Sequence, residues 1–135
     1  MDESPLAKKL LIKPGQRAVI INPPTGYLES LGPLPTGVEL SKEPDAAFDF
    51  VQLFVTNSEE LAQFAAVAAG AAKRDGILRV SYPKQSSRVK TDLTRDKGWE
   101  PLHQAGFVGM AMVSIDDTWS AFRFRPSDMV GKKKG

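Results

Sequence analysis

The chain has 135 residues, the usual size of one domain and long enough to bury roughly two-thirds of its unfolded surface. Its composition, 41% hydrophobic and 25% charged residues, is typical of a globular protein and excludes a disordered chain. Cysteine is absent, which excludes disulfides, thiolate metal sites and cysteine nucleophiles. The net charge is only +2, and the final Lys132-Lys133-Lys134 carries much of it, so the basic face of a nucleic-acid-binding protein is not expected.

Two features of the sequence indicate the cellular location of the protein. Residues 1–5 are acidic and polar and lack the basic and apolar regions of a secretory signal. The longest apolar run, residues 64–72, is too short to span a bilayer. We therefore expect a cytoplasmic protein without a membrane partner.

The first half of the chain alternates helical and strand-like segments. A short helix is predicted over residues 6–12, and a strand buried on both faces over residues 17–22, where apolar residues run without polar alternation. A proline-rich stretch with a helical turn at residues 27–31 follows. Residues 38–41 then alternate like an edge strand, and residues 48–55 form a third predicted strand.

A long helix follows the third strand. Asn57 is predicted to cap it, and Glu59 and Glu60 fall in its first turn, where acidic side chains stabilise a helix. The small side chains of its alanine-rich face suit packing against a sheet. Asp75-Gly76 is predicted to turn the chain into a fourth strand over residues 77–82.

The sequence pattern of the last third of the chain predicts a helix and two strands. Pro101 fits the first turn of a helix over residues 99–104, which Gly106 ends. Strands are predicted over residues 107–115 and 120–125, and their short connection makes them antiparallel. Residues 1–126 are therefore expected to form one Rossmann-like domain, and residues 127–135 a flexible basic tail.

This order of elements predicts an α/β fold with a doubly wound, mostly parallel sheet and a C-terminal antiparallel strand pair. The order resembles a reduced class I methyltransferase sheet that lacks an early strand. Residues 73–78 followed by Tyr82-Pro83-Lys84 are similar to the fifth strand of that family and its surroundings.

Several motifs resemble the signatures of an uncharacterised bacterial family of unknown function. They are Pro14-Gly15, residues 32–35, Tyr82-Pro83-Lys84, residues 91–99 and residues 115–124. The resemblance covers nearly the whole chain and implies the methyltransferase-like Rossmann fold, but no activity, cofactor or substrate. Its motif residues with expected structural roles are Trp99, Asp116, Asp117, Trp119, Ser120 and Arg123.

The loop after the first strand is the first candidate site, because ligands of doubly wound sheets bind at the carboxyl ends of strands. Asn22, Thr25 and Gly26 are candidate ligand contacts there. A cofactor loop of the methyltransferase type is rich in glycine, whereas this loop carries Pro23-Pro24, which removes two backbone donors. We therefore expect no cofactor by the usual mode. Glu43 or Asp45, after the second strand, is either a ribose ligand or a solvated acid.

The segment after the fourth strand is the second candidate site. Tyr82, Lys84, Ser87 and Thr91 are candidate ligand contacts in a loop rich in donors, which forms either a phosphate or carboxylate site or a solvated polar loop. Asp92 and Arg95 are also candidates. With Asp96 they are predicted to form either an ion-pair and capping arrangement that locks the loop or a ligand-positioning group.

The remaining polar residues point to structure more than to catalysis. Asp116 and Asp117 either shape the final hairpin turn, with Trp119 as a core anchor, or bind a cation if they converge. His103 is the only histidine and has no nucleophile or second metal ligand at a recognisable spacing. No catalytic residue and no metal site are predicted.

These observations leave three functions open. The leading hypothesis is a non-catalytic module that binds a small ligand or a protein. The alternative is a minimal or degenerate methyltransferase that uses S-adenosylmethionine, and the third is weak nucleic-acid binding through the lysine tail and the loop after the fourth strand. The terminal strand pair leaves a sheet edge that must be covered, charged or paired, and a homodimer through it is one such arrangement.

Overall fold

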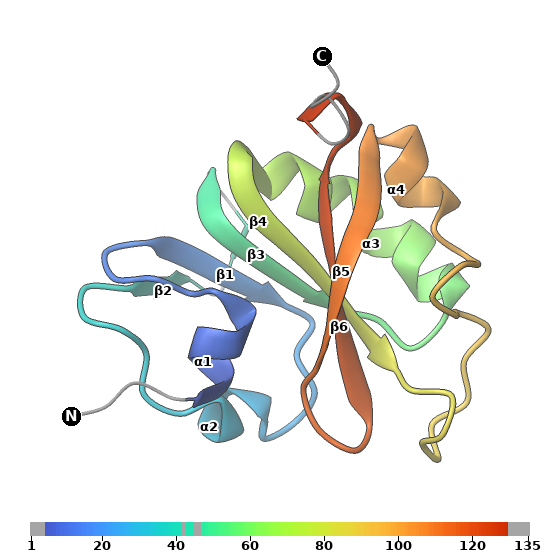
Figure 1. Cartoon of the computed structure of the whole chain (residues 1–135), viewed down its shortest axis with the longest axis horizontal. Helices are drawn as coiled ribbons and strands as arrows, with labels where there is room; N and C mark the ends of the chain where they lie inside the picture. The colour runs from blue at the N-terminus through green and yellow to red at the C-terminus, as the bar shows by residue number, and fades with distance from the viewer. Residues whose placement is uncertain (1–4, 42, 45–46, 130–135) are drawn as a thin grey trace.

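The computed structural model describes residues 5–41, 43–44 and 47–129 (Figure 1). In this part of the chain the strands form one sheet of six, in the order β2-β1-β3-β4-β6-β5. The strands span Arg17–Ile21 (β1), Glu39–Ser41 (β2), Phe48–Phe54 (β3), Ala72–Pro83 (β4), Phe107–Ser114 (β5) and Trp119–Pro126 (β6). The helices are Pro5–Leu10 (α1), Tyr27–Leu31 (α2), Ser58–Ala71 (α3) and Glu100–Gln104 (α4), followed by a 3-10 turn, Ser127–Met129 (η1).

The sheet has the predicted topology. β1 pairs in parallel with β2 and β3, and β3 pairs in parallel with β4. β6 runs antiparallel to β4, and β5 antiparallel to β6. The doubly wound, mostly parallel sheet and its antiparallel C-terminal pair are therefore confirmed.

Two apolar layers hold the sheet between the helices, which Figure 1 shows on its two sides. Leu61, Ala65 and Ala68 of α3 pack on one face with Leu102 of α4. Leu10 of α1 packs on the other face, together with Tyr27 and Leu31 of α2. Burial on both faces explains why β1 reads as a continuous apolar run after Arg17.

Predicted helix ends agree with the observed caps. The Asn57 side chain accepts a 2.8 Å hydrogen bond from the Glu60 amide and caps α3. Pro101 lies in the first turn of α4, and Gly106 follows the helix with φ 92°, a value that glycine adopts without strain.

One predicted boundary is wrong. Asp75-Gly76 is not a turn, because β4 already begins at Ala72, directly after α3. A Cβ atom on Gly76 would lie 2.9 Å from the main-chain oxygen of Asp49, so glycine allows this close approach to β3. Residues 127–129, the start of the predicted tail, form η1, and Asp128 in this turn pairs with Arg74. Residues 130–135 lie outside the described residues.

Candidate functional site

The strand order reverses between β1 and β3, because β2 lies on one side of β1 and β3 on the other. In open parallel sheets such a reversal leaves a crevice outside the carboxyl ends of the strands, where ligands bind. A cavity of about 180 Å³ lies at this place, lined by Asn22, Pro23, Pro24, Phe54, Thr56, Glu60 and Trp119. The loop predicted from sequence therefore lies at the position where this fold class binds its ligands.

Asn22 turns the chain out of β1 in the left-handed region, at φ 59°. Its side-chain amide donates to the main-chain oxygen of Phe54 at 2.9 Å and to the Glu60 carboxylate at 3.1 Å. Asn22 thereby joins the ends of β1 and β3 to the start of α3.

Glu60 is the acidic group of the crevice. Its carboxylate accepts hydrogen bonds from the Thr56 amide at 2.7 Å and from the Thr56 hydroxyl at 3.0 Å, besides the bond from Asn22. Thr56 and Glu60 lie at the carboxyl end of β3 and in the first turn of α3, so the sheet and the helix both position this carboxylate.

Aromatic rings form the other wall of the crevice. The ring of Trp119 stands edge-on to that of Phe54, with centroids 5.1 Å apart, and Tyr27 contacts the same phenyl ring at 4.5 Å. The crevice therefore combines an aromatic wall with hydrogen-bonding groups, a combination common in sites that bind small ligands.

The remaining residues of this loop lie beside the crevice. Thr25 is exposed, and Gly26 precedes α2 with φ 84°. Pro23 and Pro24 offer no backbone donors, and the Pro24 carbonyl already accepts from the Tyr27 amide at 3.0 Å. Glu43 is exposed after β2, and Asp45 lies outside the described residues.

In the donor-rich loop after β4, several side chains already form hydrogen bonds within the loop or to the neighbouring strand β5. The Lys84 ammonium donates to the Ser114 hydroxyl at 2.7 Å, and the Ser87 hydroxyl donates to the Lys84 carbonyl at 2.9 Å. The Thr91 hydroxyl accepts from the Leu93 amide at 3.0 Å. Arg88 remains exposed beside a hollow of about 550 Å³ that this loop lines.

Asp92 and Arg95, which follow this loop, do not interact with each other. Asp92 accepts hydrogen bonds from the hydroxyl and, at 2.8 Å, the amide of Ser58, and these bonds hold its pKa below the usual range. The structure thus places Asp92 at the start of α3, and none of the ion pairs among the described residues involves Arg95. Tyr82 points to the face of the sheet that α3 and α4 cover, where burial raises its pKa.

The hairpin acids shape a turn. Asp116 accepts from the amides of Thr118 and Trp119, both at 2.8 Å, while Asp117 is exposed. Ser120 pairs across the strands with Tyr82, and Trp119 packs partly buried against the core. No group of three metal-ligating side chains occurs among the residues that the structure describes.

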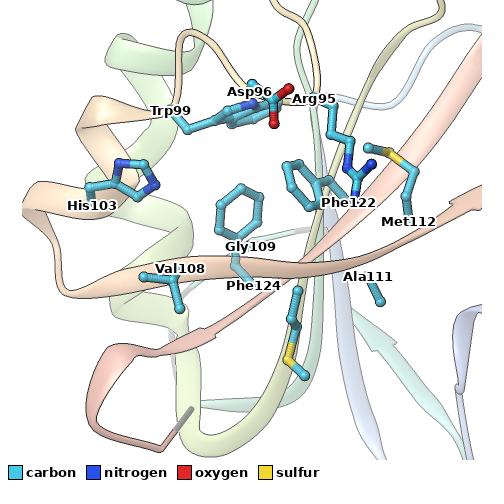
Figure 2. A pocket seen from close by; sticks show the side chains of 11 residues that line it. Arg95, Asp96, Trp99, His103, Val108, Gly109, Ala111, Met112, Phe122 and Phe124 are labelled. Carbon is cyan, nitrogen blue, oxygen red and sulfur yellow. The ribbon is translucent and has the colours of Figure 1, made fainter. Parts of the chain in front are cut away.

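A larger cavity, which the sequence did not indicate, lies beside β5 and α4 (Figure 2). Its volume is about 680 Å³, and the rings of Trp99, Phe122 and Phe124 point into it, with Arg95 reaching toward Met112. His103 of α4 and Asp96 also lie on its border. This aromatic groove can hold an apolar group.

Gly109 makes room for one of the rings that line the groove. A Cβ atom at this position would lie 2.4 Å from Cζ of Phe122, so the phenyl ring occupies the space where another residue has its side chain. The register of β5 shifts between Gly109 and Ala111, and Met110 is 43% exposed at this irregularity. A glycine in an apparently regular strand is the signal that could have revealed the irregularity.

A series of hydrogen-bonded, buried side chains crosses the face of the sheet that α1 and α2 cover. The Tyr27 hydroxyl donates to Oε1 of Gln52 at 2.9 Å, and Nε2 of Gln52 donates to the Ser81 hydroxyl at 3.0 Å. Gln52 and Ser81 are fully buried, and Tyr27 is 5% exposed. Burial raises the pKa of Tyr27 to about 12. This series of hydrogen bonds fixes α2 on the sheet beneath the crevice.

Comparison with solved structures identifies the fold. The chain is similar to a methyltransferase dependent on S-adenosylmethionine (SAM) from Aquifex aeolicus, with a TM-score of 0.60 and 14% identity over 87% of this chain and 85% of that one. It is also similar to DhpI in complex with S-adenosylhomocysteine (SAH), with a TM-score of 0.58 and 16% identity over 90% of this chain and 83% of that one. The ribosomal protein L11 methylase of Lactobacillus delbrueckii subsp. bulgaricus gives a TM-score of 0.57, 13% identity and coverages of 90% and 74%. The fold is thus the methyltransferase-like Rossmann fold.

Other comparisons add no family. No protein-family model and no curated protein matches the chain. Within the described residues, none of the helices has the length and apolar character needed to cross a membrane.

Proposed function

We propose that this chain is a minimal methyltransferase-type domain that binds SAM, with a cofactor crevice narrowed by its own side chains. The observation that carries the proposal is the polar and aromatic crevice at the reversal of strand order, in a sheet similar to those of SAM-dependent methyltransferases. The same site in related folds binds ligands at the ends of these strands.

The residues of the crevice match the chemistry of the cofactor. Phe54 and Trp119 provide an aromatic wall for a purine ring, while Thr56 and Glu60 provide groups that hydrogen-bond hydroxyl or amino groups. When bound, the cofactor would supply a methyl group for transfer. The role of this chain's residues would be to bind and orient it.

The crevice does not match the cofactor in size in this conformation. Its volume of about 180 Å³ is below the range of roughly 300 Å³ and more that drug-sized ligands occupy. The Asn22 side chain is the obstacle that can move, and to leave the crevice it has to give up its hydrogen bonds to the Phe54 carbonyl and to the Glu60 carboxylate. We therefore expect weak binding that is coupled to displacement of this side chain.

An amide NMR titration tests the proposal. Saturable shifts at Asn22 and at residues 56–60 with SAM or SAH, and not with nicotinamide cofactors, support it. Glu60→Ala should weaken the affinity, whereas Glu59→Ala, a change at an exposed acid in the same helical turn, should leave it unchanged. A well-dispersed spectrum that does not respond to either ligand would overturn the proposal.

One observation favours a second function. The polar groups of the crevice are already hydrogen-bonded to one another, and two prolines replace backbone donors in its loop. A closed crevice of this kind suits a non-catalytic module that binds another protein or a different small ligand. The absence of any response to SAM and SAH would make this second function the better account.

A further inference from the structure

Two arginine side chains meet on the face of the sheet that α1 covers. Arg79 of β4 and Arg123 of β6 are direct cross-strand partners in the antiparallel register. Arg79 is only 2% exposed, and Arg123 is partly buried. Like charges directly opposite each other in neighbouring strands repel, so this pair needs a compensating partner.

The hydrogen bonds of the pair are incomplete. Nε of Arg79 donates to the Leu10 carbonyl at the end of α1, at 2.9 Å. Nη1 of Arg79 and Nε of Arg123 are buried, and neither has an acceptor among the described residues. Folded proteins leave few buried donors unpaired, and a bound ion is a recognised reason for the exceptions.

No acidic side chain compensates the two charges within the described part of the chain. The ion pairs there join Arg17 with Glu39, Lys73 with Asp49, and Arg74 with Asp128. Burial, and then the charge of Arg123, lower the pKa of Arg79 to about 10, so its guanidinium is still charged at neutral pH. Burial and the neighbouring Arg125 lower the pKa of Arg123 as well.

We propose that Arg79 and Arg123 together bind a phosphate group. The two unpaired donors belong to adjacent guanidinium groups, whose planar N–H forks fit the oxygens of phosphate or carboxylate. A phosphate group carries about 1.5 to 2 negative charges at neutral pH and offsets most of the charge of both arginines, whereas a carboxylate offsets only one. Arg123 is partly buried, and both unpaired nitrogens lie inside the protein, so an anion reaches them when the side chains that cover them move.

This site is separate from the crevice and does not depend on the proposed function. Arg79 lies four residues before Pro83, where β4 ends, and Arg123 lies four residues after Trp119, where β6 begins. The pair therefore lies along the sheet, away from the carboxyl edge. The ligand is a small phosphate-bearing molecule or free inorganic phosphate.

The test follows the Nε–H signals of the arginines by proton–nitrogen NMR at constant ionic strength. Inorganic phosphate should shift the Arg123 signal saturably, and acetate should do so at least several-fold more weakly. A phosphate monoester that binds more tightly than inorganic phosphate would identify an organic ligand as the source. Sodium chloride serves as the control for screening.

Variants complete the test. Arg123→Gln should abolish the phosphate response of Arg79, and Arg123→Lys, which keeps the charge but loses the fork, should weaken it several-fold. Arg74→Gln, a change at an exposed ion-paired arginine, should leave the response unchanged. If the wild-type signals do not saturate, if acetate binds as well as phosphate, or if Arg123→Lys binds like the wild type, the proposal is wrong. The titration of the wild type and Arg123→Lys decides the matter even if Arg123→Gln fails to fold.

Discussion

The side-chain amide of Asn22 lies 3.1 Å from the carboxylate of Glu60 and joins the end of β1 to the first turn of α3. Both side chains line the crevice of about 180 Å³ at the place where the strand order reverses.

Two substitutions of Asn22 separate its backbone role from its side-chain role. Asn22 has φ 59°, which glycine adopts freely and alanine adopts at a cost of about 1–2 kcal/mol. We expect Asn22→Ala to be less stable than Asn22→Gly by about 1 kcal/mol, although alanine otherwise favours the folded state. Urea unfolding of both variants measures this difference, and equal stability would show that the left-handed conformation is absent.

The buried chain from Tyr27 to Ser81 depends on Gln52. Gln52→Leu leaves both buried hydroxyls without a partner, so we expect the free energy of unfolding to fall by about 2–4 kcal/mol. Tyr27→Phe should cost less, about 1 kcal/mol. Because both changes disturb the same hydrogen bond, the double variant should lose clearly less than the sum of the two. Additive losses in denaturant unfolding would disprove the coupling.

Tyr27 makes stability depend on pH in the alkaline range. Its pKa is raised to about 12 from the model-peptide value of 10.0, so the unfolded state releases this proton first as the pH increases. The stabilisation is present in full below pH 10 and is lost as the pH rises to 12, with a total of about 2–3 kcal/mol. Comparing the unfolding free energies of the wild type and Tyr27→Phe between pH 9 and 12 measures it, and parallel curves would contradict it.

Two glycines should respond oppositely to alanine. Gly98 has φ 99°, and a Cβ atom there would lie 2.4 Å from Cδ2 of the buried Leu93. Gly98→Ala should therefore cost about 1–3 kcal/mol. Gly70, near the end of α3, has no atom within 4 Å of that position, so Gly70→Ala should stabilise by about 0.5 kcal/mol. Thermal unfolding of the two variants checks the opposite signs.

Sequence patterns predicted the fold well where the signals were local. The uninterrupted apolar run of β1 arises because both faces of this strand are buried, and Asn57 caps α3 through a bond to a residue three positions away. Asp75-Gly76 misled the prediction, since a glycine that turns a chain and a glycine that allows close approach look alike in sequence.

The site was predictable only in part, because its decisive contacts join residues far apart in the chain. Asn22 could be placed in the right loop, but its partner Glu60 is 38 positions away. Asp92 bonds Ser58 across 34 positions, although a nearer partner, Arg95, was available in the sequence. Arg79 stood in a strand-like run, and only the folded chain shows that Arg123 opposes it.

Calorimetric titration of SAH into the wild type and Asn22→Gly tests the central claim most directly. If the crevice is a narrowed cofactor site, the wild type should show saturable one-to-one binding. Asn22→Gly should bind roughly tenfold more tightly, equal to about 1.4 kcal/mol, because the side chain that fills the crevice is gone. The absence of saturable heat with both folded proteins would contradict the claim.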